Sequence, residues 1–161
     1  MIIKNHCHIL ALALFILFPV LAFSQTAAEM DDMLSSGIVS AARAARFVLG
    51  SADLLPQGIS GPEAEKAAYD MAASKGWIRI SADQSITQKD AAFLIMRAFD
   101  LKGGVMYSLF KNPRYAYREM TYRKLIQGRT DQSLKLSGPA LLYILDRTLR
   151  YTGENADGGA I

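Results

Sequence analysis

Tyrosine and arginine side chains alternate along residues 106–129, and these two residue types bind sugars and anions. The stretch reads MYSLFKNPRYAYREMTYRKLIQGR, and its candidate binding residues are Tyr107, Arg114, Tyr115, Arg118, Tyr122, Arg123 and Lys124. Aromatic faces stack on sugar rings, and guanidinium groups hold phosphate or carboxylate in bidentate geometry. The stretch therefore predicts a surface that binds glycan strands, anionic lipid headgroups or an acidic protein.

The same stretch has a second interpretation, as an ordinary amphipathic helix. A core stripe at helical spacing would consist of Tyr117, Met120, Leu125 and Ile126. The basic residues would then form a solvated face. Tyr115 and Tyr122 are seven residues apart and share one helix face in either interpretation, so they are expected to line a partner surface.

The first 24 residues have the three parts of a secretory signal peptide. Lys4 gives a positive start, residues 9–23 form an uncharged apolar run, and Ala22-Phe23-Ser24 places small residues before a cleavage site at Gln25. The run is shorter than the ~20 residues of a spanning helix, which favours cleavage over an uncleaved anchor. We expect residues 1–24 to be removed and the mature chain to reside in the periplasm or cell envelope. It would have no stable membrane span and no nucleic-acid partner.

Catalytic and metal-binding side chains are scarce in the mature chain. His6, Cys7 and His8 are the only histidines and the only cysteine, and all three lie in the signal peptide. Their removal excludes cysteine nucleophiles, Ser-His-Asp triads and thiolate zinc sites. Asp83 and Asp131 lie in polar loops that lack the EF-hand spacing of calcium ligands. We therefore expect no catalytic residues, no metal, no cofactor and no enzymatic activity.

Charge is distributed unevenly along the mature chain. Residues 25–101 contain 7 basic and 10 acidic side chains, whereas residues 102–150 contain 10 basic and 3 acidic ones. Residues 102–150 are therefore a basic lobe with a net charge of +7. The length of residues 25–151 suits a single domain. The Gly-rich, polar segment 152–161 is predicted to be a disordered tail.

The spacing of apolar residues is helical almost throughout, which predicts an all-α fold. The expected helices cover about 26–35, 40–49, 62–75, 87–101, 112–126 and 137–151. Ser40, Thr87 and Ser137 stand at three helix starts, where a side-chain hydroxyl accepts a hydrogen bond from a free backbone N–H. We therefore interpret these three residues as structural helix caps.

The helices are predicted to repeat in tandem. The segment WIRISADQSI aligns with LIQGRTDQSL at an offset of 48 residues, and the helices that follow align at an offset of 50, with Thr87 on Ser137 and Arg97 on Arg147. A single helix pair cannot bury its own apolar face, whereas stacked pairs close a common core. The predicted units are a partial repeat at 26–50 and full repeats at 62–101 and 110–151.

The sequence of a helix, a turn, a polar loop with Asp, and then Ile-Thr-x-x-Asp before a second helix resembles the S-layer homology repeat. The matching residues are Gly76, Trp77, Ile78, Asp83, Ile86, Thr87, Asp90, Phe93 and Leu94, and in the second copy Leu125, Ile126, Gly128, Asp131, Leu134, Ser137 and Leu141. The resemblance implies tandem repeats packed as a small helical bundle, commonly pseudo-threefold, that dock exported proteins onto cell-wall polysaccharide. In that family an Arg that contacts the polymer follows the Thr, and here the position is Gln88 or, in the second copy, Gly138.

These features predict an exported, non-enzymatic binding or scaffold protein of the bacterial envelope. The first hypothesis is that the aromatic face and the Ala-rich helix 40–49 dock a protein partner in an envelope complex. The missing Arg favours this hypothesis. The alternative is that the basic lobe binds peptidoglycan or another anionic cell-wall polymer, and such binding would weaken steeply with salt.

Overall fold

A computed structural model describes residues 27–56, 58–128 and 131–157 of the chain. The chain divides into two units, residues 1–32 and 33–161. Of the first unit only residues 27–32 are described, and they are helical. The predicted signal peptide, residues 1–24, lies outside the described residues. The second unit contains all the features below.

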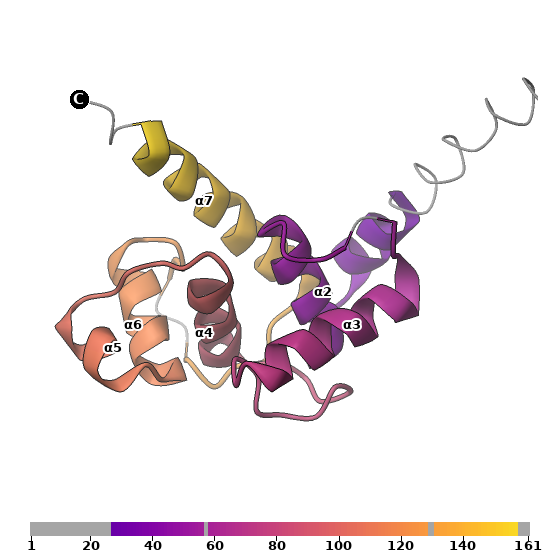
Figure 1. Ribbon diagram of the computed structural model, residues 1–161, viewed down its shortest axis with the longest axis horizontal. Helices are drawn as coiled ribbons and strands as arrows, with labels where there is room; N and C mark the ends of the chain where they lie inside the picture. Colours follow the sequence, from indigo (N-terminus) through magenta and orange to yellow (C-terminus); the bar gives the residue numbers. More distant parts are fainter. Residues whose placement is uncertain (1–26, 57, 129–130, 158–161) are drawn as a thin grey trace, which may run out of the picture. The chain divides into compact units, whose positions relative to one another are not determined.

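The second unit is built from helices. They are labelled in Figure 1 as α2 (Ala41–Ser51), α3 (Gly61–Ser74), α4 (Gln88–Ala98), α5 (Val105–Phe110), α6 (Pro113–Tyr122) and α7 (Gly138–Asp157). Extended pairing in the described ranges is limited to two isolated bridges, Ser40–Ser85 and Thr87–Lys135. The predicted all-α fold is confirmed. No helix in these ranges is both long enough and apolar enough to cross a membrane.

Four of the labelled helices begin at a side-chain cap: Asn112 at the start of α6 accepts from the Tyr115 N–H at 3.1 Å, and the other three are the predicted caps. Ser40, Thr87 and Ser137 each accept a hydrogen bond from the backbone N–H three residues ahead, at 3.3–3.4 Å between nitrogen and oxygen. The Thr87 hydroxyl also donates to a carboxylate oxygen of Asp90 at 2.5 Å. This reciprocal contact satisfies a free donor at the start of α4 and places a negative charge at its positive end.

The segment around 105–126 differs from the prediction. α6 ends at Tyr122 rather than near Ile126. Lys124 takes a left-handed backbone conformation with φ of 60°, and the Leu125 N–H returns to the Met120 carbonyl at 2.9 Å, which closes the helix end. α5 has no counterpart among the predicted helices because six residues carry too little periodicity to reveal one.

The C-terminal segment also differs. α7 continues to Asp157, so the prediction of a disordered tail beginning at residue 152 is wrong for residues 152–157. Gly153 weakens a helix by only about 1 kcal/mol, and no proline follows it to end the helix. Residues 158–161 lie outside the described residues.

Three extended segments close a ring of backbone hydrogen bonds between the helices. The Val39 N–H donates to the Leu136 carbonyl (2.9 Å), the Leu136 N–H to the Ile86 carbonyl (3.0 Å), and the Ile86 N–H to the Val39 carbonyl (3.0 Å). All three side chains are buried. Each of the three residues immediately precedes a capping hydroxyl. The loops before α2, α4 and α7 therefore occupy equivalent positions around one centre.

A second set of backbone hydrogen bonds joins the same three segments, and the third segment makes one bond fewer than the other two. One residue after each cap, the N–H of Ala41, Gln88 or Gly138 donates to a carbonyl of a neighbouring segment at 2.8–3.0 Å. The next residue also donates across the ring in the first two segments. In the third segment that residue is Pro139, which has no N–H to donate.

The core forms where helices pack in pairs. α3 packs against α2, and α6 packs against α4. Ala41, Ala44 and Ala45 of α2 are fully buried, as are Ala64, Ala68 and Ala72 of α3, and such small side chains let the two helices approach closely. The Ala-rich helix 40–49 thus contributes its alanine face to the core. Docking of a partner by the other faces of this helix stays a prediction, because side chains such as Arg43 and Phe47 are only partly buried.

Candidate functional site

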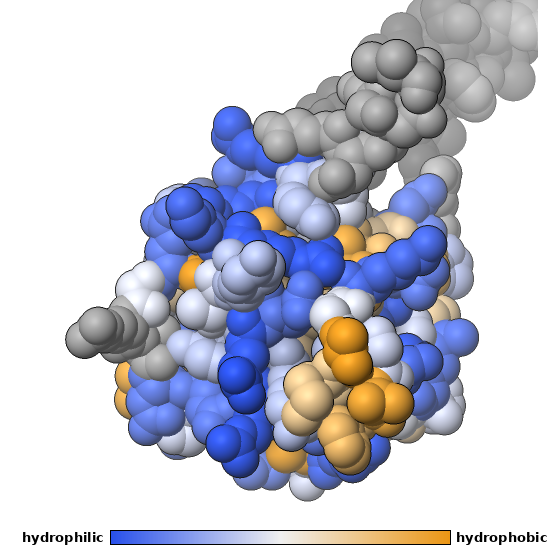
Figure 2. Space-filling model, turned by 90° about the vertical axis from the view of Figure 1, so that its left-hand side faces the viewer, coloured by the Kyte–Doolittle hydropathy of each residue, from blue (hydrophilic) through white to orange (hydrophobic). Residues whose placement is uncertain are grey.

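Large apolar side chains are exposed on α5 and at the end of α6. We define the α5–α6 surface as Val105, Met106, Leu109, Phe110, Tyr115 and Tyr122. The exposed fraction is 77% for Val105, 70% for Leu109 and 84% for Tyr122. Figure 2 turns the side that carries α5 and α6 toward the viewer, and hydrophobic side chains gather there in one patch among hydrophilic ones. A contiguous exposed apolar patch of this kind is a candidate interaction site.

The composition of α5 explains this exposure. Five of its six side chains are apolar or aromatic, yet only Tyr107 is buried. The Tyr107 ring packs so closely on Gly103 that a Cβ at position 103 would lie 2.4 Å from it. Phe110 stacks on Tyr115 of α6 with 5.5 Å between the ring centroids. One buried anchor and one ring stack hold α5 in place, and its other apolar side chains stay in solvent.

A hollow of about 270 Å³ opens within the α5–α6 surface. Its walls include Val105, Met106, Tyr115, Arg118 and Tyr122. The structure thus brings Tyr115 and Tyr122 to the same hollow, as their spacing predicts. Tyrosine and arginine, together with tryptophan, are enriched among the residues that dominate the binding energy of protein interfaces.

Exposed cations accompany this surface along the same stretch of chain. They are Lys102, Lys111, Arg114, Arg118 and Lys124. None of them forms an ion pair with any residue that the structure describes. The predicted binding residues Arg114, Arg118 and Lys124 are therefore available to a partner.

Two predicted binding residues have a different position. Tyr107 is only 5% exposed, and its hydroxyl has no hydrogen-bond partner in the described part of the chain. Burial raises the pKa of this phenol above its ordinary value, while the nearby Arg97 guanidinium acts in the opposite direction. Tyr107 is therefore a core anchor, and its predicted contact with a partner through an exposed ring is not what the structure shows.

Arg123 is the second exception, because its guanidinium is held by the protein itself. It donates to a Glu119 carboxylate oxygen at 2.9 Å, to the Tyr151 hydroxyl at 2.9 Å and to the Lys102 carbonyl. The other Glu119 oxygen accepts from the Gly104 N–H at 3.0 Å. The pair therefore fastens the loop before α5 to α6. The i, i+4 spacing of Glu119 and Arg123 is the sequence signal for this structural ion pair.

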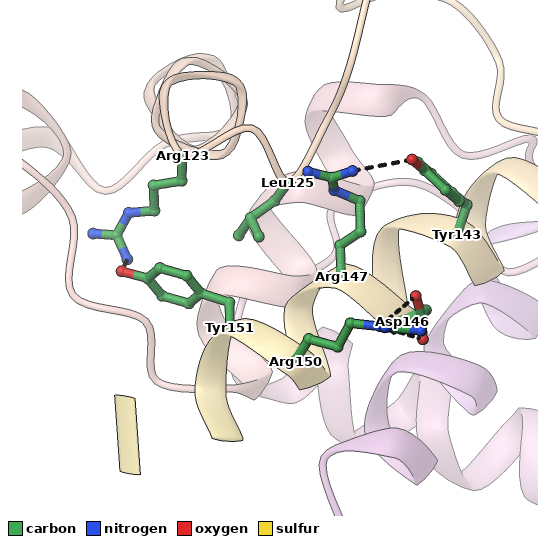
Figure 3. Close-up of a pocket in the computed structure, with 7 residues that line it drawn as sticks. All are labelled: Arg123, Leu125, Tyr143, Asp146, Arg147, Arg150 and Tyr151. Carbon is green, nitrogen blue, oxygen red and sulfur yellow. Dashed lines mark hydrogen bonds and ion pairs between the residues drawn. The ribbon is translucent and has the colours of Figure 1, made fainter. Parts of the chain in front are cut away.

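An arginine-lined groove lies apart from the α5–α6 surface, between the end of α6 and α7 (Figure 3). Its volume is about 420 Å³, and its walls are Arg123, Leu125, Tyr143, Asp146, Arg147, Arg150 and Tyr151. Arg150 donates through Nε to both oxygens of Asp146 at 3.0 and 3.1 Å. Arg147 donates to the Tyr143 hydroxyl at 3.0 Å and lies over its ring. We call this depression the Arg147 groove.

A second groove of about 380 Å³ lies at the end of α4. Its walls include Arg97, Asp100, Lys102, Tyr107 and Lys111. We call it the Arg97 groove. Four wall residues of the two grooves correspond at an offset of 50 positions. They are Met96 with Asp146, Arg97 with Arg147, Asp100 with Arg150, and Leu101 with Tyr151. The alignment of Arg97 with Arg147 was the sequence signal for both grooves, although neither arginine is among the predicted binding residues.

The described residues contain no group of three or more His, Cys, Asp or Glu side chains that could hold a metal ion. Comparisons with protein-family models, with curated proteins and with solved structures give no match. The resemblance to S-layer homology repeats therefore rests on the quoted residues and stays a prediction.

Proposed function

We propose that this chain is an exported, non-enzymatic scaffold protein of the cell envelope that docks a partner protein through the α5–α6 surface. The observation that carries the proposal is the set of exposed apolar and aromatic side chains on α5 and at the end of α6. Burying a Val, Leu or Phe side chain contributes roughly 1.5–3 kcal/mol, so covering this surface is a substantial driving force for association.

The charges on the same stretch define the chemistry of the partner. The exposed cations of residues 102–124 have no acidic counterpart in the described ranges, so an acidic partner surface would complement them. Such complementarity raises the association rate, whereas the apolar contacts at the centre set the lifetime of the complex. The proposed partner is therefore a protein with an apolar patch flanked by Asp and Glu.

The ring of hydrogen bonds supports the proposed tandem-repeat framework. The three ring residues each precede an aligned helix cap, as related units packed around one centre would require. In this framework the helices provide a rigid support, and α5 is an insertion that carries the docking function. Export follows from the signal-peptide pattern of residues 1–24.

A photo-crosslinking amino acid at position 109 tests the proposal in envelope fractions of the producing cell. The exposed position 63 on α3 is the matched control. We expect protein adducts of discrete mass from position 109 only, and their loss in the double variant Phe110→Ser/Tyr122→Ser. Adducts with lipid alone, or equal adducts from both positions, would show that the surface does not dock a protein.

The second candidate function is binding of peptidoglycan or another anionic wall polymer by the basic lobe. It is favoured by the exposed guanidinium groups of Arg114 and Arg118, which form no ion pair with any residue that the structure describes. Co-sedimentation with sacculi at low and high salt tests it, with the double variant Arg114→Ala/Arg118→Ala beside the control Arg79→Ala. Salt-sensitive pelleting that only the double variant loses supports polymer binding. Wild-type protein that stays in the supernatant excludes it.

A further inference from the structure

The Arg147 groove and the Arg97 groove share one layout. In each, an arginine lies over an aromatic ring, Tyr143 on the wall of the Arg147 groove and Trp77 beside the Arg97 groove, and further cations stand on the groove walls. We propose that the two grooves are equivalent oxyanion sites, each of which binds a carboxylate or phosphate group through Arg97 or Arg147. The Arg147 groove shares no wall residue with the α5–α6 surface, whereas Lys102 and Lys111 of the Arg97 groove are among the cations that accompany that surface.

Among the described residues, the hydrogen-bond partners of Arg147 are neutral. Its guanidinium carbon lies 5.5 Å from the centre of the Tyr143 ring, and one terminal nitrogen donates to the Tyr143 hydroxyl. When the Gln127 side-chain amide is oriented so that its nitrogen donates to the Tyr143 hydroxyl, its oxygen accepts from a terminal nitrogen of Arg147 at 2.8 Å. The buried Nε of Arg147 has no acceptor in the part of the chain that the structure describes. These contacts orient the guanidinium without neutralising its charge.

Arg150 extends the Arg147 groove one helical turn further (Figure 3). Among the described residues it bonds through Nε alone, to Asp146, and the side chain is largely exposed. Its two terminal nitrogens make no hydrogen bond with the described residues. Side chains three positions apart are neighbours on a helix, so an oxyanion in the groove can contact Arg147 and Arg150 together. Planar guanidinium groups hold such anions in bidentate geometry.

The Arg97 groove has the same excess of positive charge. Arg97 lies over the Trp77 ring, whose centre is 5.9 Å from the guanidinium carbon, and Lys75 approaches the same ring at 5.2 Å. Lys102 and Lys111 add two ammonium groups to the groove walls, and Asp100 supplies the one carboxylate. Arg97 has no ion pair in the described ranges. An oxyanion would balance this charge in a partly enclosed site, where electrostatic attraction is stronger than in open water.

The test follows the arginine Nε–Hε signals of ¹⁵N-labelled protein by NMR during titration with inorganic phosphate or with acetate. Ionic strength is held constant with sodium chloride. We expect the Arg97 and Arg147 signals to move and saturate, whereas the exposed Arg79 signal stays in place. The variant Arg147→Gln should abolish the response at its own groove and leave that of Arg97 intact, and Arg97→Gln should do the converse.

The two titrants distinguish the source of the oxyanion. Saturation with phosphate but not acetate indicates a phosphate-bearing ligand, and the reverse result indicates a carboxylate-bearing one. Shifts that chloride alone reproduces, or that Arg79 shares, would overturn the proposal. A response at only one of the two grooves would overturn their equivalence.

Discussion

Gly138 belongs to the ring of backbone hydrogen bonds and has no space for a Cβ atom. The substitution Gly138→Ala therefore tests the packing of this ring. A Cβ at this position would lie 1.7 Å from the Met33 carbonyl oxygen. Because ordinary contacts of this kind are about 3.5 Å, the backbone would have to separate by roughly 1.5–2 Å. The same separation would stretch the 2.9 Å hydrogen bond from the Gly138 N–H to the Ser36 carbonyl.

The expected cost combines three effects. Overpacking of this severity costs about 1–3 kcal/mol, and the weakened hydrogen bond costs about 1 kcal/mol more. Alanine is a better helix former than glycine by about 1 kcal/mol, which offsets part of the loss. We therefore expect Gly138→Ala to lower the free energy of unfolding by about 1–3 kcal/mol, a large share of the ~5–15 kcal/mol typical of a domain.

Urea unfolding followed by circular dichroism at 222 nm measures this change. The matched control is Gly153→Ala, the same substitution in the same helix, where a Cβ would meet nothing within 4 Å. The control should raise the free energy of unfolding by up to about 1 kcal/mol, so the two variants should change stability in opposite directions. A Gly138→Ala protein as stable as the wild type would refute the close approach of residue 33 to the start of α7.

Three further predictions concern stability. Thr87→Ala removes the cap of α4 and should lower the free energy of unfolding by about 1 kcal/mol, measured by urea titration. Met120→Ala empties a fully buried position and should cost about 2–5 kcal/mol, whereas Met106→Ala on the exposed α5–α6 surface should change stability by less than about 0.5 kcal/mol. A comparable loss for both would contradict the exposure of α5. Hydrogen bonds from the Ser133 N–H and hydroxyl hold the pKa of Asp131 below its usual value, so the folded state favours the carboxylate. The stability that this carboxylate adds is present above its unfolded pKa and is lost as pH falls through its folded pKa. The stability difference between wild type and Asp131→Asn should therefore shrink on acidification, and a constant difference from neutral to acidic pH would refute this account.

Local patterns predicted the helices and their starts well because they depend on neighbours in the chain. A hydroxyl three residues before a free N–H forms its bond whatever the rest of the fold does, and Ser40, Thr87 and Ser137 do so. The shared face of Tyr115 and Tyr122 followed from helix geometry in the same way. The short α5 and the extension of α7 were missed, because local propensity is weak in both segments and their surroundings decide the outcome.

The candidate site shows the limit of this reasoning. The sequence determined which residue types are concentrated in 106–124, and it determined the tandem alignment of Arg97 with Arg147. Only the tertiary structure decided which of these side chains face water. Tyr107 and Arg123 have the same residue types as Tyr122 and Arg118, yet one is buried against Gly103 and the other is held by Glu119 and Tyr151. The spacing of Glu119 and Arg123 is a local signal, but the Arg123 contacts with the Tyr151 hydroxyl and the Lys102 carbonyl join segments distant in sequence, and no local pattern records them.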